Sequence, residues 1–335
     1  MSILPYILPT LTVVSLFLYI FSAEKAWLPK MGTTEWITRA SAKKHMTTDI
    51  KLKLSWKDII ICIGIAAVYG GLLVLMGLSK LSSIVAPIVC TAVFVSAVYL
   101  ISYLLFDNRV TALVAAIITA SDMFLLLTFT SDYMLLLLLA AFVLTTLMAV
   151  YNLVALVFAG IYLSLAAFID PSCALFSLLA LCPAVVTSIR TKNGRPIYMY
   201  LLMCVLLPAV IYIGMNYGIY GNISFVMALR APEFFNIRYC LCIAACFIFA
   251  VIHIFKDKSF PALFAAVGLV LSAISMFFGN NFVPLFSGIT AAVLADIIIR
   301  RGKAYNKVFC IIFCAVMLIP VLYCTVYPFI STYII

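Results

Sequence analysis

Two adjacent apolar runs within residues 110–150 set the strongest constraint on how this chain can fold. Each run is long enough to cross a bilayer as a helix, and only the short polar break at residues 128–132 separates them. Because lipid offers no hydrogen-bond partners to an open backbone, two such runs must form a tight helical hairpin. The hairpin carries Asp122 within its first run and Asp132 at its turn, and a third carboxylate, Asp170, lies one hairpin further on.

The composition places the whole chain in the same class. Of its 335 residues, 67% are hydrophobic and 10% are charged, whereas a soluble domain carries roughly 25% charged residues. We therefore expect an all-α polytopic membrane protein without a soluble domain. The eleven cysteines lie mostly inside apolar runs and make no paired metal spacing with histidine, so they are interpreted as small buried side chains. No metal site and no cofactor is predicted, although a pair of outer carboxylates could hold a divalent cation.

About twelve apolar segments are predicted to cross the membrane as helices. The first lacks a basic leading region and a small-residue cleavage site, so it is interpreted as a retained span and not as a signal peptide. Residues 1–57 form one predicted unit, a first transmembrane helix followed by a basic loop, and residues 58–335 form the transmembrane helical domain. The predicted spans are residues 3–22, 58–79, 82–106, 110–129, 133–150, 152–169, 171–189, 197–215, 237–255, 260–278, 282–300 and 308–331.

The basic residues are distributed unevenly over the predicted loops. With the loop after the first span placed in the cytoplasm, all of the 21 Lys and Arg residues except Lys80, Arg230 and Arg238 fall on the cytoplasmic side. Both termini are then predicted on the non-cytoplasmic side of a cell inner or plasma membrane. The net charge of +10 follows from this topology, so no nucleic-acid partner is expected.

The long cytoplasmic loop, residues 23–57, holds all three tryptophans of the chain and a candidate helix at residues 34–45. Tryptophan beside basic residues is typical of a segment at headgroup level, so membrane lipids are expected partners of this loop. The alternative interpretation of the loop is a solvated basic tether.

The acidic residues of interest also have structural interpretations. Asp132 and Asp170 precede predicted helices, where a carboxylate often caps the next helix, and a proline follows Asp170. Asp122 lies about 12 Å from the outer end of its span at 1.5 Å per residue, a depth at which an unpaired carboxylate is costly. It is expected to face the bundle interior, in a functional role or bonded to Thr and Ser hydroxyls. Asp296 is interpreted as the ion-pair partner of Arg300, one turn later.

Four successive patterns in residues 58–189 carry a resemblance to a known family. They are YGGLLVLMGLS, LISYLLFDNR, the span VTALVAAIITASDMFLLLTF with its turn TSDYMLL, and the hairpin LVALVFAGIYLSLAAFIDP. This stretch resembles the membrane-embedded GT-C sugar transferases of the polyprenyl-phosphate-dependent mannosyltransferase and aminoarabinose transferase type. The chain departs from that family at residues 78–82, where a long outer loop with a catalytic acid is replaced by a short loop with Lys80. Asp170 also stands where family members often carry a lysine.

The resemblance implies a GT-C-like helical bundle that transfers a sugar from a polyprenyl phosphate at the outer leaflet. Asp132 first, and Asp170 second, would act as the general base on the acceptor hydroxyl. Arg230 or Arg238 would hold the departing phosphate. The candidate substrate-binding residues are thus Arg230, Arg238, Asp122 and Lys80.

Two other functions stay open from the sequence. A secondary transporter would use Asp122 as its coupling carboxylate, although the chain shows no convincing two-fold internal repeat. A non-catalytic subunit would pack against other membrane subunits and use its basic, Trp-bearing loop as a handle. The transferase requires an outer-leaflet cavity lined by Asp132 and Asp170, the transporter requires a central water-accessible cavity, and the scaffold requires a large apolar face covered by another chain.

Overall fold

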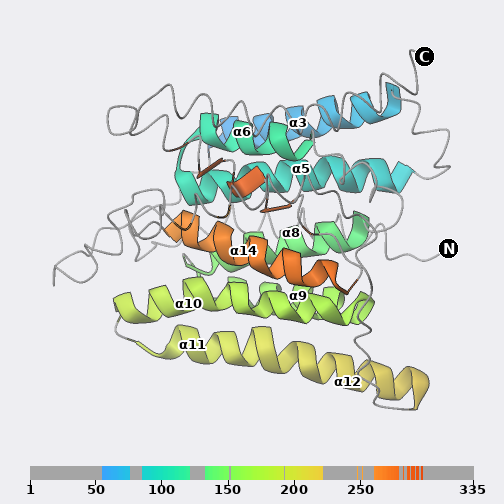
Figure 1. Cartoon of the computed structure of the whole chain (residues 1–335), viewed down its shortest axis with the longest axis vertical. Coiled ribbons are helices and arrows are strands. Elements are labelled where there is room, and N and C mark those ends of the chain that lie inside the picture. Colours follow the sequence, from blue (N-terminus) through green and yellow to red (C-terminus); the bar gives the residue numbers. More distant parts are fainter. Residues whose placement is uncertain are drawn as a thin grey trace.

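Helices make up all of the regular secondary structure in the part of the chain that the structure describes (Figure 1). The structure is a computed structural model, and the all-α expectation is confirmed within its described residues. These residues are 55–75, 85–120, 133–150, 152–191, 193–221 and 260–278, together with positions 247, 251, 282, 285–286, 288–290, 292–293 and 296.

The helices lie where the apolar segments predict them, and most of their ends fall within a few residues of a predicted boundary. Their bounds are α3 Trp56–Leu75, α5 Val85–Phe106, α6 Arg109–Ala120, α8 Tyr133–Met148, α9 Ala155–Ile169, the 3-10 helix η1 Pro171–Phe176, α10 Ser177–Thr191, α11 Arg195–Tyr200, the π-helix η2 Leu201–Leu206, α12 Leu207–Tyr220 and α14 Phe260–Met276. Within the described ranges, four helical stretches are long and apolar enough to cross a membrane: Trp56–Val74, Pro87–Phe106, Pro171–Ile189 and Arg195–Ile219. The predicted spans 3–22 and 308–331 and the candidate helix 34–45 lie outside the described residues, so the count of twelve stays a prediction.

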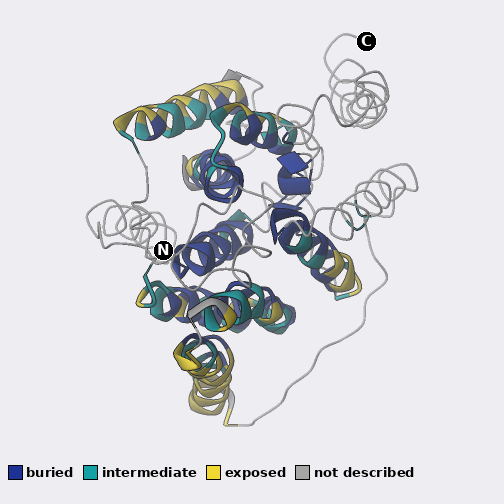
Figure 2. Cartoon of the chain, turned by 90° about the vertical axis from the view of Figure 1, so that its left-hand side faces the viewer, coloured by how far each residue is buried: buried dark blue, intermediate teal, exposed yellow. Residues whose placement is uncertain are grey.

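α5 and α8 lie at the centre of the bundle, whereas α3 and α12 lie at its two edges (Figures 1 and 2). α5 packs against α3, α6 and α8, and α8 packs against α9, which contacts α12. The central span Pro87–Phe106 is 78% buried, but only 22% of Trp56–Val74 and 17% of Arg195–Ile219 are buried. The exposed edge faces are apolar, as Val68 and Val210 illustrate. A buried apolar centre with apolar outer faces is the arrangement that lipid requires, and the chain is a membrane protein of packed helices.

The turn between α5 and α6 fixes how these two helices meet. Asp107 takes a left-handed backbone conformation with φ of 51°, which ends α5. The Asn108 side-chain oxygen then accepts a hydrogen bond from the Val110 N–H at 3.0 Å and caps α6. The starts of α3 and α6 therefore lie beside the end of α5, which we call the Arg109 end of the bundle. The opposite end, where α9 stops, is called the Asp170 end.

A π-helical turn interrupts the long helix that comprises α11, η2 and α12. Pro208 has no N–H, and the Leu207 N–H donates to the Leu202 carbonyl five residues back. The Met203 carbonyl would normally accept a hydrogen bond from the Leu207 N–H, but that N–H bonds to Leu202 instead. Pro208, the next possible donor, has no N–H. Gly160 of α9 packs against this carbonyl, and a Cβ at Gly160 would overlap the Met203 oxygen. The missing side chain allows the two backbones to approach closely, as small residues do in membrane bundles.

We expect Gly160→Ala to lower the unfolding temperature, because the added Cβ meets a backbone oxygen that cannot turn away. The matched control is Gly214→Ala on α12, where no atom lies within 4 Å of the added Cβ. In that open position alanine should be neutral or should stabilise the helix by about 0.5–1 kcal/mol. Thermal unfolding of both variants in nanodiscs measures the difference, and equal unfolding temperatures would contradict the close approach of α9 and η2.

Candidate functional site

Of the residues predicted for the site, Asp170 lies within the described part of the chain. The other candidates lie outside it: Asp132, Asp122, Arg230, Arg238 and Lys80. Two polar arrangements can therefore be built in atomic detail, one at each end of the bundle.

Asp170 marks the break between α9 and η1. Its backbone is extended, Pro171 follows as the first residue of η1, and its Oδ1 accepts a hydrogen bond from the Ser172 N–H at 2.7 Å. This geometry confirms the predicted capping role. The half-buried carboxylate has further lone pairs beyond the one used in the cap, so an acceptor hydroxyl could still bond to it.

The capped turn also orders its surroundings at the Asp170 end. The Phe176 ring, at the end of η1, meets the Phe282 ring edge-on with a centroid distance of 5.2 Å. The same ring stacks on Phe286 at 6.0 Å. All three side chains are fully buried. The Asp170 cap therefore positions a short helix that joins the residues after α14 to the rest of the bundle.

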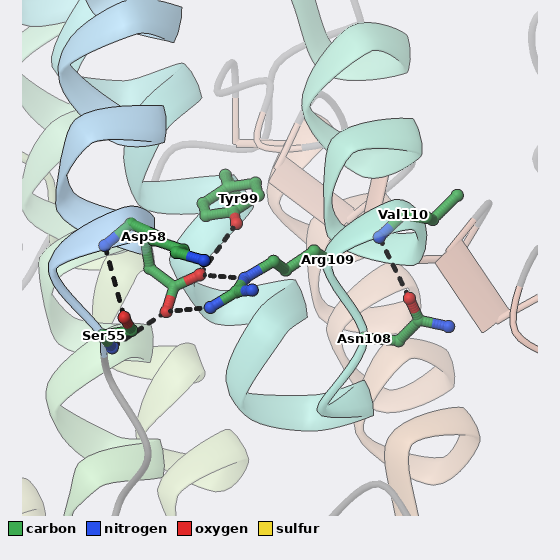
Figure 3. Close-up of polar contacts among 7 residues, drawn as sticks. Ser55, Asp58, Tyr99, Asn108, Arg109 and Val110 are labelled. Carbon is green, nitrogen blue, oxygen red and sulfur yellow. Dashed lines mark hydrogen bonds and ion pairs between the residues drawn. The ribbon is translucent and has the colours of Figure 1, made fainter.

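The described polar contact of greatest consequence lies at the Arg109 end. Asp58, in the first turn of α3, forms an ion pair with Arg109, the first residue of α6 (Figure 3). The Arg109 Nε lies 2.6 Å from Oδ1 of Asp58, and its Nη2 lies 3.2 Å from Oδ2. The carboxylate is fully buried, whereas 41% of the Arg109 side chain is exposed. This bidentate geometry is the strongest form of an arginine–carboxylate contact.

Two further donors complete the coordination of the Asp58 carboxylate. The Ser55 N–H donates to Oδ2 at 2.9 Å, and the Tyr99 hydroxyl of α5 donates to Oδ1 at 3.4 Å (Figure 3). α3 and α5 are also joined by the Ser96 hydroxyl, which donates to the Cys62 carbonyl at 3.0 Å. A buried charge is tolerated in an apolar bundle when it is paired and fully hydrogen-bonded. The cluster therefore links three helices and leaves no acceptor position of Asp58 for a substrate.

The sequence patterns described above do not predict this pair. The one available signal is that each residue lies in the first turn of its own apolar helix. The two positions are separated by 51 residues, however, and only the packing of α3 beside α5 and α6 brings them together.

The residues with described side chains contain no group of three or more His, Cys, Asp or Glu that could hold a metal ion. The described chemistry thus consists of a capping carboxylate at one end and a saturated ion pair at the other.

Comparisons with known proteins give one structural likeness. No family model and no curated protein matches the chain. The crystal structure of the Archaeoglobus fulgidus oligosaccharyltransferase in the apo form is similar to it with a TM-score of 0.42 and 15% sequence identity. The match covers 72% of this chain but only 43% of that chain. A likeness of this size transfers no activity and no site residue.

We expect Arg109→Leu to lower the unfolding temperature strongly, because it leaves the buried Asp58 carboxylate without its counter-charge. The double variant Asp58→Leu/Arg109→Leu should recover part of the loss, since it removes both charges together. Arg195→Leu, at an exposed position, serves as the control for loss of a cation. Thermal unfolding of the three variants in nanodiscs tests the pair. A double variant no more stable than Arg109→Leu would show that the pair is not what holds the Arg109 end together.

Proposed function

We propose that this chain is a GT-C-like membrane glycosyltransferase that uses a polyprenyl-phosphate-linked sugar at the outer leaflet. The sequence patterns in residues 58–189 are the basis of the proposal. The arrangement of α8 and α9 is the structural observation that supports it.

The described chain neighbours of the two candidate general bases lie at the same end of the bundle. α8 begins at Tyr133, directly after Asp132, and α9 ends at Ile169, directly before Asp170. Tyr133 lies close enough to Cys90, near the start of α5, for the two to interact. α5 and α8 are therefore parallel, and α9 packs antiparallel to α8. An acceptor at the Asp170 end could reach either carboxylate by this topology.

In the proposed reaction the sugar donor enters from the bilayer at the Asp170 end. Asp132 takes the proton from the acceptor hydroxyl, and Asp170 is the second candidate for this role. The acceptor oxygen then bonds to the anomeric carbon of the sugar as the bond from that carbon to the phosphate oxygen breaks, through a transition state with positive charge on the carbon. Arg230 or Arg238 stabilises the departing phosphate. Asp122 and Lys80 complete the proposed substrate contacts.

The proposed orientation places the Asp170 end outside and the Arg109 end in the cytoplasm. The described basic residues support it, because Lys57, Arg109, Arg190 and Arg195 all lie at starts or ends of helices at the Arg109 end. This distribution is typical of the cytoplasmic side. Both termini are then outside.

A cysteine introduced at Lys43 and one introduced at Asp132 should react with a membrane-impermeant maleimide from opposite sides. Labelling is measured in intact and in permeabilised cells that express each variant. The parent chain is the control for labelling of the native cysteines. The reagent should reach the Asp132 position in intact cells and the Lys43 position only after opening. Labelling of both positions from one side would contradict the proposed topology.

Asp132→Asn should reduce sugar transfer by about 10²–10⁴-fold, the usual contribution of a general base. Asp170→Asn should have a smaller effect, and Asp107→Asn, at the Arg109 end, should leave transfer unchanged. Transfer from a polyprenyl-phosphate sugar to the acceptor pool can be followed by mass spectrometry at matched expression. Unchanged glycan output for Asp132→Asn would overturn the enzymatic proposal.

A second candidate is a non-catalytic membrane subunit, in which another chain would replace part of the lipid against the exposed apolar edge of α11 and α12. Tyr198, Val210 and Ile219 are among the large side chains exposed there. Covering such an edge with another chain would bury apolar and aromatic area. Co-purification of a stoichiometric membrane partner, together with unaltered glycan output for Asp132→Asn, is the result that this candidate predicts.

A further inference from the structure

Two groups can be distinguished among the buried Ser and Thr hydroxyls of the described helices. Those of the first group donate to a carbonyl of their own helix: Thr91, Thr145, Ser164, Ser272, Ser275 and Thr290. The Ser96 hydroxyl also belongs here, although its one proton is shared between the Ala92 carbonyl of its own helix and the Cys62 carbonyl of α3. Those of the second group make no hydrogen bond: Ser102, Thr111 and Thr146. A helical Ser or Thr can usually bond to the carbonyl one turn back, so a buried hydroxyl that does not do so invites a search for another partner.

Thr111 lies on the face of α6 that packs against the residues after α14. The space that a Cβ of Gly288 would fill is taken by Ala115 and Thr119 of α6. Thr111, Ala115 and Thr119 are each four residues apart and so share one helix face. All three are buried.

Asp296 lies on the facing surface of the other segment. The described residues at 285–286, 288–290, 292–293 and 296 are helical, and Gly288, Ala292 and Asp296 are each four residues apart. Gly288 contacts α6 directly, so the same face carries Ala292 and Asp296 toward α6. Asp296 is only 7% exposed.

The register places Thr111 and Asp296 at one level. The segment after α14 runs from the Asp170 end, where Phe282 meets Phe176, toward the Arg109 end, and α6 runs the opposite way. Gly288 lies between Ala115 and Thr119. From this contact the antiparallel register is expected to place Ala292 between Thr111 and Ala115. A second turn, about 12 Å of helix from Gly288 at 1.5 Å per residue, is expected to bring Asp296 level with the start of α6, between Asp107 and Thr111.

We propose that the Thr111 hydroxyl and the Asp296 carboxylate form a buried site for a small ligand that the two side-chain oxygens bind together. The ligand is an ordered water molecule or a monovalent metal ion that bridges the two side chains. A carboxylate accepts hydrogen bonds or holds a cation. Asp296 already makes one interaction, but its buried Oδ1 accepts no hydrogen bond and can take a further partner. The small residues Ala115, Gly288 and Ala292 hold the two helices close together, which favours a ligand of this size. This site is independent of the proposed sugar transfer, because it lies at the opposite end of the bundle.

The substitution Thr111→Val distinguishes an occupied site from an empty one. Valine keeps the shape of threonine and removes its hydroxyl. If the hydroxyl binds a ligand, the variant should unfold at a lower temperature than the parent chain. If the hydroxyl has no partner, removing it should leave the unfolding temperature unchanged or raise it. Thr146→Val is the matched control, since Thr146 is also fully buried without a partner but lies on α8.

The unfolding temperatures are measured for the full chain in nanodiscs, in sodium, potassium or choline chloride at one ionic strength. The expected result is a lower value for Thr111→Val and no decrease for Thr146→Val. A decrease present only in sodium or potassium identifies a metal ion, and a decrease that is equal in all three salts identifies water.

Asp296→Asn provides the second test, because two residues that share a ligand must be energetically coupled. The effect of Thr111→Val should shrink or vanish in the Asp296→Asn background. If Asp296→Asn does not fold, a cryo-EM map of the parent chain should show density between the two side chains. An unchanged or raised unfolding temperature for Thr111→Val overturns the proposal, as does an effect that is equally large in both backgrounds.

Discussion

A charge placed among hydrocarbon chains must be paired, and the Asp58–Arg109 pair shows how this requirement organises the bundle. The carboxylate is fully buried and receives donors from Arg109, from Tyr99 and from the backbone of Ser55. Each donor comes from a different place in the chain, so satisfying one charge fixes three helices at once. The tight turn at Asp107 makes this possible, because it returns the chain so that α6 starts beside the end of α5. The pairing thus determines the local packing.

Away from that pair, close packing depends on glycines, whose missing side chains allow neighbouring helices to approach. Lipid tails are as apolar as leucine, so apolar burial alone gives little preference for one helix neighbour over another. Gly160 against the Met203 carbonyl and Gly288 against α6 supply contacts that a lipid cannot replace. The Gly268 position, where the Phe286 ring takes the place of a side chain, works in the same way. Charge pairing and backbone proximity together specify which helices touch.

These two sources of specificity explain what the sequence could and could not predict. The helix positions follow from the length and hydropathy of each run, and the Asp170 cap follows from a local Asp-Pro pattern. Whether a helix lies at the centre or at the edge of the bundle does not follow from its hydropathy. α3 and α5 are similarly apolar, yet α3 faces outward and α5 is buried. The Asp58–Arg109 pair and the shared level of Thr111 and Asp296 depend on helix register, which a single sequence does not contain.

The two ends of the bundle therefore differ in what their carboxylates can do. At the Arg109 end the acceptor positions of Asp58 are filled by protein donors, so this acid stabilises the fold and is a poor candidate for chemistry. At the Asp170 end the described carboxylate makes a single capping bond and is half-buried, which leaves it able to meet a ligand at the membrane surface. The Asp58 carboxylate is thus saturated by protein donors, whereas the Asp170 carboxylate keeps acceptor positions open.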